Sequence, residues 1–497
     1  MGAICALPAA AQVSDTPLSA IDWLREATPA PASRIAPNEP GTASEIARSE
    51  VTVTALDDPS QSLDGIGLIP AAITGLPPTL WGASRPEDLA HRLRQAGPRL
   101  LPALQSLLYR LILAELDPPT ASNDADHLLL LARIDKLMEL GAVEQAEALL
   151  ARAGPADAGL LARWFDAALL IGEEGKVCAA LLDKIPRSPG QLATIFCTAR
   201  AGDWARAALL LENGAALGLI EPAQRDLMAR FLDPDLFEGD PPPPLPRPMT
   251  PLAFRLFEAI GEPVPTQRLP LAYAPTDLRD NIGWKARLEA AERLARTGAV
   301  ADNKLIGLYT ERRAAASGGV WERVRAVREL EAALATNDTQ KLTQILPDLW
   351  RELNAAGTLL PIAERYGPAL AKLPLEGQAA DIARKMGLLS PEYESVALAG
   401  PEDFLASVAR GLPGKPQSAR ERAIRDGFAA TQPPARLASL MDSNRLGEAI
   451  LRAILLFEEG RGGDFDGLAD AIALLRMVGL EDTARRAALE FLLLEPR

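Results

Sequence analysis

The chain has 497 residues, of which 48 % are apolar and 24 % charged, so it is long enough for two or three domains with sizeable cores. Its net charge of −14 disfavours nucleic acid and anionic membrane surfaces as general partners, because both repel an acidic protein. The most apolar stretch, LLPALQSLLYRLILAEL, is interrupted by Gln105 and Arg110, so no transmembrane segment of the required roughly 20 residues is expected.

The N-terminal residues MGAICALPAAAQ are small and apolar, and Ala9-Ala10-Ala11 fits the pattern that signal peptidase cuts. A positive region, which normally opens an export signal, is missing. We therefore expect residues 1–11 to be a signal-peptide remnant whose true start lies upstream of Met1, which directs the mature protein to the periplasm. A flexible cytosolic N-terminus is the alternative.

Residues 12–80 are rich in Pro, Ser and Thr and poor in core residues, which predicts an extended arm without its own hydrophobic core. Within it, the alternating residues 51–54 predict a strand. The arm also carries one short apolar stripe that is our candidate for binding a partner. This stripe either lies in a groove of that partner or caps the first exposed repeat of the same chain. Its residues are Leu18, Ile21, Trp23 and Leu24.

From 81 to 233 the apolar periodicity predicts helices throughout, and a pattern recurs that joins them in pairs. A glycine ends one helix and begins another, and a small residue follows five positions later. Glycine can adopt the left-handed conformation that ends a helix, and the small residue allows the next helix to approach closely. The pairs are Gly141 with Ala146, Gly172 with Val177, Gly202 with Ala207 and, near the C-terminus, Gly479 with Ala484.

These pairs resemble half of the tetratricopeptide repeat (TPR), in which a turn glycine is followed five residues later by an alanine of the second helix. The resemblance implies a TPR-like α-solenoid, a stack of helical hairpins in an all-α protein. Solenoids expose long faces that commonly bind other proteins.

Residues 234–275 are rich in proline and include GDPPPPLPRPMTP, which predicts a linker between the repeats and a C-terminal helical array at 276–497. The linker is either a semi-rigid spacer that wraps the helical surface or a ligand of the PxxP type.

Two stretches of the C-terminal half, DLRDNIGWKARLEAAERLARTGAV and LYTERRAAASGGVWERV, are similar to a family of exported proteobacterial helical-repeat proteins, some of which carry the label antifreeze glycopeptide. Antifreeze glycopeptides repeat Ala-Ala-Thr, whereas this chain contains that tripeptide once, at 429–431. The resemblance therefore implies export and a helical fold, not ice binding.

Cys178 and Cys197 would be the only thiols of the mature protein. The turn-forming sequence IPRSPG lies midway between them, so two antiparallel helices joined there would hold both sulfurs at nearly the same height. In an oxidising compartment this arrangement predicts a disulfide; two buried free thiols are the alternative.

Catalytic chemistry has little support in the sequence. His91 and His127 are the only histidines, and neither belongs to a zinc motif. Nucleophile-elbow, Walker and dinucleotide motifs are absent as well. The fragment GRGGDFDGLAD has Asp464 and Asp466 but lacks the third acid and the closing Glu of a calcium loop. We therefore predict no catalytic, cofactor or metal-binding residue.

The sequence favours a non-enzymatic scaffold that binds a protein partner in the cell envelope. The alternative is a periplasmic glycan-active enzyme similar to lytic transglycosylases, whose catalytic Glu is followed by Ser as in Glu394-Ser395. Four tryptophans in helical contexts either line a groove or pack between repeats. They are Trp164, Trp204, Trp321 and Trp350.

Overall fold

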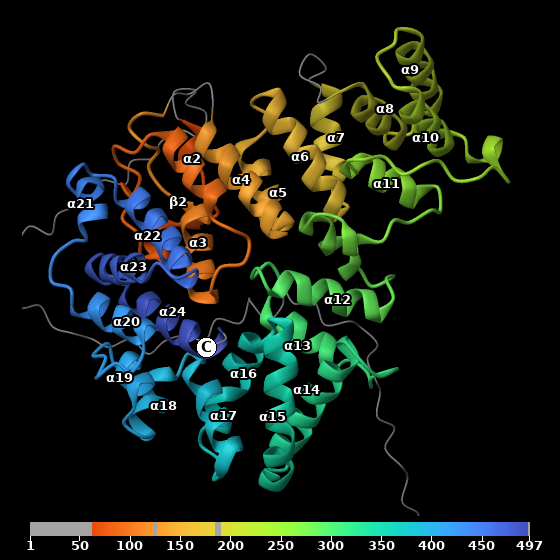
Figure 1. Ribbon diagram of the computed structural model, residues 1–497. Coiled ribbons are helices and arrows are strands. Elements are labelled where there is room, and N and C mark those ends of the chain that lie inside the picture. Colours follow the sequence, from red (N-terminus) through yellow and green to blue (C-terminus); the bar gives the residue numbers. More distant parts are fainter. Residues whose placement is uncertain (1–61, 123–126, 184–189, 496–497) are drawn as a thin grey trace, which may run out of the picture. The chain divides into compact units, whose positions relative to one another are not determined.

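The computed structural model describes residues 62–122, 127–183 and 190–495 (Figure 1). Over these ranges the protein is all-α, as the sequence predicts, and most helices pack against the next helix along the chain. The exception is a short parallel pairing of β1 (Ile69–Pro70) with β2 (Ala114–Glu115).

The first group of helices contains the predicted repeats and the elements that come before them. Its members are η1 (Leu63–Gly65), α1 (Ala71–Thr74), α2 (Pro86–Gln95), α3 (Pro102–Leu113), α4 (Leu128–Leu140), α5 (Val143–Ala153), α6 (Ala158–Ile171), α7 (Glu174–Asp183), α8 (Gln191–Arg200), α9 (Trp204–Ala216) and α10 (Pro222–Leu232).

The proline-rich segment contains four helical elements. They are η3 (Pro234–Phe237), α11 (Pro251–Ala259), η4 (Thr266–Arg268) and η5 (Leu271–Leu278). Helix α11 packs on α6 and α10, and η5 packs on α4, α6 and α12 (Trp284–Ala295). The aromatic rings of Phe254 and Tyr273 are buried and meet edge to face. This segment is therefore part of the hydrophobic core of the helical body, because apolar residues interrupt its prolines.

The remaining helices run to the end of the described chain. They are α13 (Asp302–Thr310), α14 (Val320–Ala335), α15 (Thr339–Ala356), α16 (Leu359–Leu370), α17 (Gly377–Leu388), α18 (Tyr393–Ala399), α19 (Phe404–Ala409), α20 (Ala419–Ala429), α21 (Ala435–Asp442), α22 (Leu446–Arg461), α23 (Phe465–Met477) and α24 (Glu481–Leu494).

Helix boundaries follow from local chemistry. Asp157 precedes α6, and its carboxylate accepts hydrogen bonds from the backbone N–H groups of Gly159 at 2.6 Å and Leu160 at 2.9 Å. These bonds satisfy donors that have no partner within the helix. Helix α4 ends at Gly141, whose φ of 79° is readily adopted only by glycine.

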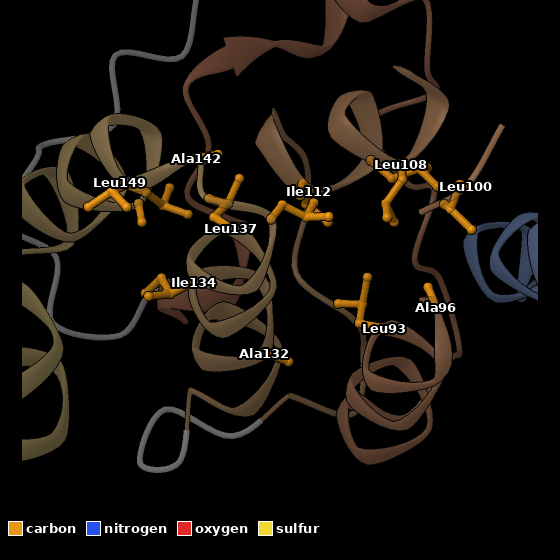
Figure 2. Close-up of a cluster of buried hydrophobic side chains, with 14 of the residues drawn as sticks. Leu93, Ala96, Leu100, Leu108, Ile112, Ala132, Ile134, Leu137, Ala142 and Leu149 are labelled. Carbon is orange, nitrogen blue, oxygen red and sulfur yellow. The ribbon is translucent and has the colours of Figure 1, made fainter. Parts of the chain in front are cut away.

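The hydrophobic core has two main parts. One part joins the helices before α12 with the helices from α18 onward, and the other is built from α12 to α17. Figure 2 shows a section of the first part, where side chains of α2, α3, α4 and α5 converge; Leu93, Ile112 and Leu137 are among them. Helices that are distant in sequence thus share one core.

The last helices of the described chain pack against the first. Helix α24 contacts α3, and α22 contacts both α2 and α3, so the C-terminal helices lie beside the N-terminal ones (Figure 1). Polar contacts reinforce the packing: Arg445 forms an ion pair with Asp88 at 2.9 Å, and Arg110 donates a hydrogen bond to the Thr483 hydroxyl at 3.1 Å. Residues from both ends of the chain can therefore contribute to one site.

Among the described residues, no helix has the length and apolar character required to span a bilayer. The signal-peptide remnant at 1–11, the strand at 51–54 and the stripe of Leu18, Ile21, Trp23 and Leu24 lie outside the described residues.

Candidate functional site

The repeat-defining glycines each lie between two helices that pack together. Gly141 joins α4 to α5, Gly172 joins α6 to α7, Gly202 joins α8 to α9, and Gly479 joins α23 to α24. All four have a positive φ, between 79° and 91°. The small residues five positions later are fully buried where the second helix crosses the first; they are Ala146, Val177, Ala207 and Ala484.

Cys178 on α7 and Cys197 on α8 are joined as a disulfide, with their Cα atoms 5.1 Å apart. Both residues are buried, and their helices pack side by side. This disulfide links the helix pair α6–α7 to the helix pair α8–α9.

The residues considered for catalysis belong to different elements and have different partners. His91 is exposed on α2, whereas His127 is buried at the start of α4, with Nε2 3.8 Å from the Asp157 carboxylate. Glu394 lies on α18 and forms an ion pair with Arg485 at 2.7 Å, and 57 % of its side chain is exposed. Asp464 accepts a hydrogen bond from Gly467 N–H and caps α23.

A groove begins between α3 and the end of α24 and continues along α13, α14 and α16. It consists of three adjoining hollows of about 350, 300 and 490 Å³. The first and middle hollows share Pro102, Arg296, Gly357 and Leu360, and the middle and third share Asp302, Pro361 and Glu364. We call these three hollows together the α3–α16 groove.

Two polar side chains of α3 line the middle hollow without any hydrogen-bond partner. Gln105 is only 3 % exposed, and neither its amide oxygen nor its amide nitrogen is hydrogen-bonded; the buried hydroxyl of Tyr109 also lacks a partner. Burial raises the pKa of Tyr109, so this phenol stays protonated and able to donate. Buried polar atoms are nearly always hydrogen-bonded in proteins, so three unpartnered atoms on two neighbouring side chains distinguish this wall from the rest of the core.

Gly298 packs closely against these two side chains. A Cβ atom at this position would come within 3.3 Å of the Tyr109 ring and 3.7 Å of Gln105 Cγ. Its φ of 69° also favours glycine. The turn between α12 and α13 therefore packs directly over the Gln105 side chain.

A pair of carboxyl groups separates the middle hollow from the third. Asp302 is the first residue of α13, and its carboxyl group is hydrogen-bonded to that of Glu364 on α16. The loss of surrounding solvent, together with the neighbouring Glu364 charge, raises the pKa of Asp302 to about 6. Glu364 also pairs with Arg486 of α24 at 2.5 Å. The groove thus has an acidic centre next to the unpartnered Gln105.

The sequence contained a weak signal for this site. Gln105 stands on the apolar face of α3, between Leu101 and Leu108, where a polar residue is costly unless it is bonded. The sequence does not show that Gln105 lines the same hollow as Asp302 and Glu364, because those residues come from α13 and α16.

A second surface feature lies on α9 and the turn after it. Four large apolar side chains are exposed there, whereas Trp164 and Trp321 are buried. The exposed residues are Trp204, Leu209, Leu217 and Leu219.

No protein-family model matches the chain, and no match is found among curated proteins or solved structures. The resemblance to tetratricopeptide repeats therefore depends on the glycine-joined hairpins alone.

Proposed function

We propose that the protein is a non-catalytic helical scaffold that binds a polypeptide partner in the α3–α16 groove. The observation that carries this proposal is the buried carboxamide of Gln105, which lines the groove with both its donor and its acceptor unpartnered. A carboxamide offers one carbonyl oxygen and one NH2 group, which match the N–H and C=O of a peptide unit in an extended chain. The two amide atoms have almost no exposed surface in the ligand-free structure, so a rotation of the side chain toward the hollow would let such a unit satisfy both atoms at once.

The dimensions of the groove support an extended ligand. Its three hollows, of about 350, 300 and 490 Å³, adjoin one another through shared residues. A single hollow of this size suits one or two amino-acid residues, so the series suits a short segment of chain. We further propose that the hairpins from α4 to α9 form a TPR-like solenoid that supports the groove.

The disulfide supports an oxidising compartment. Disulfides persist in the periplasm and outside cells but are rare in the cytosol. Together with the small-residue N-terminus, the Cys178–Cys197 bond favours a place in the cell envelope.

The glycan-active alternative has weaker geometric support. Glu394 is mostly exposed and ion-paired, whereas a general acid needs a protected site that raises its pKa. Asp302 and Glu364 are hydrogen-bonded to each other. Glycosidases instead hold their two carboxyl groups about 5 to 9.5 Å apart, with the sugar between them.

Photo-crosslinking in the cells that produce the protein tests the proposal. A benzoylphenylalanine replaces Ser106, an exposed residue of the groove wall, and in a control replaces the exposed Asp235. We expect a discrete polypeptide adduct at 106 that disappears with Gln105→Met and is absent at 235. An adduct that survives Gln105→Met, or no adduct at 106, would contradict the proposal.

An assay for muropeptide release from peptidoglycan tests the alternative. The scaffold proposal requires no release by the wild-type protein. Release that Glu394→Gln abolishes would establish the enzyme instead.

A further inference from the structure

We infer that the α3–α16 groove recognises a basic side chain of its polypeptide partner, whose ammonium or guanidinium group binds between Asp302 and Glu364 while Gln105 pairs with a neighbouring peptide unit. This inference rests on the proposed function and specifies the ligand of the same site.

The first argument is the lack of a cation beside Asp302. Glu364 has an ion pair with Arg486, but among the described residues no basic side chain forms an ion pair with Asp302. Its polar neighbour is another carboxyl group. Two adjacent carboxylates repel each other, and an external cation relieves that repulsion.

The second argument is that the nearby basic residues are engaged elsewhere. Arg296 donates a hydrogen bond to the Ala356 carbonyl at 2.7 Å, and the Arg365 guanidinium lies 6.0 Å from the centre of the Tyr366 ring. The Tyr366 hydroxyl in turn donates to Glu331 at 2.6 Å. Tyr366 thus engages both Glu331 and Arg365 in the third hollow, and Asp302 is left for the ligand.

The third argument is the adjacency of Gln105. Gln105, Asp302 and Glu364 line the same middle hollow of about 300 Å³. A peptide unit bonded to the carboxamide would therefore have its side chain beside the acid pair. The protein's net charge of −14 also favours the approach of a basic segment.

The raised pKa of Asp302 agrees with this assignment. With a pKa of about 6, the carboxyl group is mainly ionised at pH 7.5, in a place where solvent stabilises its charge poorly. A bound ammonium group would replace the proton that Asp302 holds at lower pH.

The test measures binding of three blocked pentapeptides to the full chain by calorimetry at pH 7.5. The probes are acetyl-Gly-Gly-Lys-Gly-Gly-amide and the same peptide with norleucine or glutamate at the centre. Norleucine keeps most of the lysine side chain but lacks its charge. We expect the lysine peptide to bind at least tenfold more tightly than the norleucine peptide, and the glutamate peptide to bind least.

Variants locate the effect within the groove. Asp302→Asn should reduce the affinity for the lysine peptide to that for the norleucine peptide, which should itself be unchanged. Asp235→Asn removes one exposed acid far along the chain from the groove residues and should have no effect. A thermal melt of each variant checks that it is folded.

The outcomes separate the two proposals. Equal binding of the lysine and norleucine peptides, both lost with Gln105→Met, would overturn the basic-residue inference and leave the peptide-binding groove standing. Absence of binding by all three peptides at millimolar concentration would overturn both. Preference for lysine that persists in folded Asp302→Asn would overturn the assignment to Asp302.

Discussion

Glu490, on the last helix of the described chain, accepts a hydrogen bond at 2.9 Å from the backbone N–H of Ala103, which lies 387 positions earlier. The carboxyl group is buried, and burial raises its pKa to about 8. The N-terminus of α3 is thereby tied to α24 through a titratable group. The stability of this contact must depend on pH.

The direction of that dependence follows from the two protonation equilibria. In the unfolded chain the Glu490 carboxyl group titrates near 4.5, and in the folded protein near 8. Between these values the folded state holds a proton that the unfolded state has lost, so the contribution of Glu490 to the free energy of unfolding falls as pH rises.

Glu490→Gln imitates the protonated carboxyl group and keeps the acceptor for Ala103 N–H. We expect this variant to exceed the wild type in free energy of unfolding by about 1 kcal/mol or more at pH 8, and to match it near pH 5. Urea denaturation at both pH values measures the difference. An equal effect at pH 5 and pH 8 would contradict the raised pKa.

The turn glycines allow a comparison between two similar positions. A Cβ atom on Gly141 would lie 2.6 Å from Leu294 Cδ2, whereas one on Gly172 would have nothing within 4 Å; both residues have a positive φ. Gly172→Ala should cost about 1 to 2 kcal/mol from backbone strain alone. Gly141→Ala should cost about 1 to 3 kcal/mol more, because it also overpacks the contact with Leu294. Equal destabilisation in denaturant would show that this contact is not tight.

The disulfide should contribute strongly to stability, because it closes a loop with a sequence separation of 19. We expect the double variant Cys178→Ala, Cys197→Ala to lose about 2 to 4 kcal/mol of unfolding free energy. Reductant should destabilise the wild type similarly and leave the double variant unchanged. If reductant has no effect on the wild-type melting temperature, the bond is absent or contributes nothing.

Gln105→Met should stabilise the ligand-free protein. Two buried polar atoms without partners are replaced by an apolar side chain of similar length, so we expect a gain of about 1 kcal/mol in unfolding free energy. Leu108→Met on the same helix is the control, with an expected loss below about 1.5 kcal/mol. A large destabilisation by Gln105→Met would mean that Gln105 is bonded within the folded protein.

The sequence predicted local features of the fold well. The helical periodicity predicts the all-α class. The glycines of the predicted pairs lie in turns between helices, because a left-handed turn and a small residue five positions later depend only on residues that are close in the sequence. The proline-rich segment was expected to be a linker, whereas Leu252, Phe254 and Phe257 of α11 are buried in the core. The many prolines predict a linker, although the apolar residues between them are what the folded protein buries.

The groove could not be predicted in the same way. Gln105, Asp302 and Glu364 belong to α3, α13 and α16, and their meeting depends on how distant helices pack. A polar residue on the apolar face of α3 was the available signal. This residue becomes a candidate for binding because the Gln105 amide has no hydrogen-bond partner, and that fact can be seen only in the folded structure.

The packing of α24 against α3 has a consequence for biosynthesis. The ribosome makes Glu481–Leu494 after nearly all other described residues, yet α3 completes its core only with that helix in place. Until then the nascent chain lacks one of the helices that pack on α3, whose side chains Leu104 and Leu107 are fully buried in the finished protein. Completion of this core must therefore await the synthesis of α24, and until then the chain is a natural substrate for chaperones.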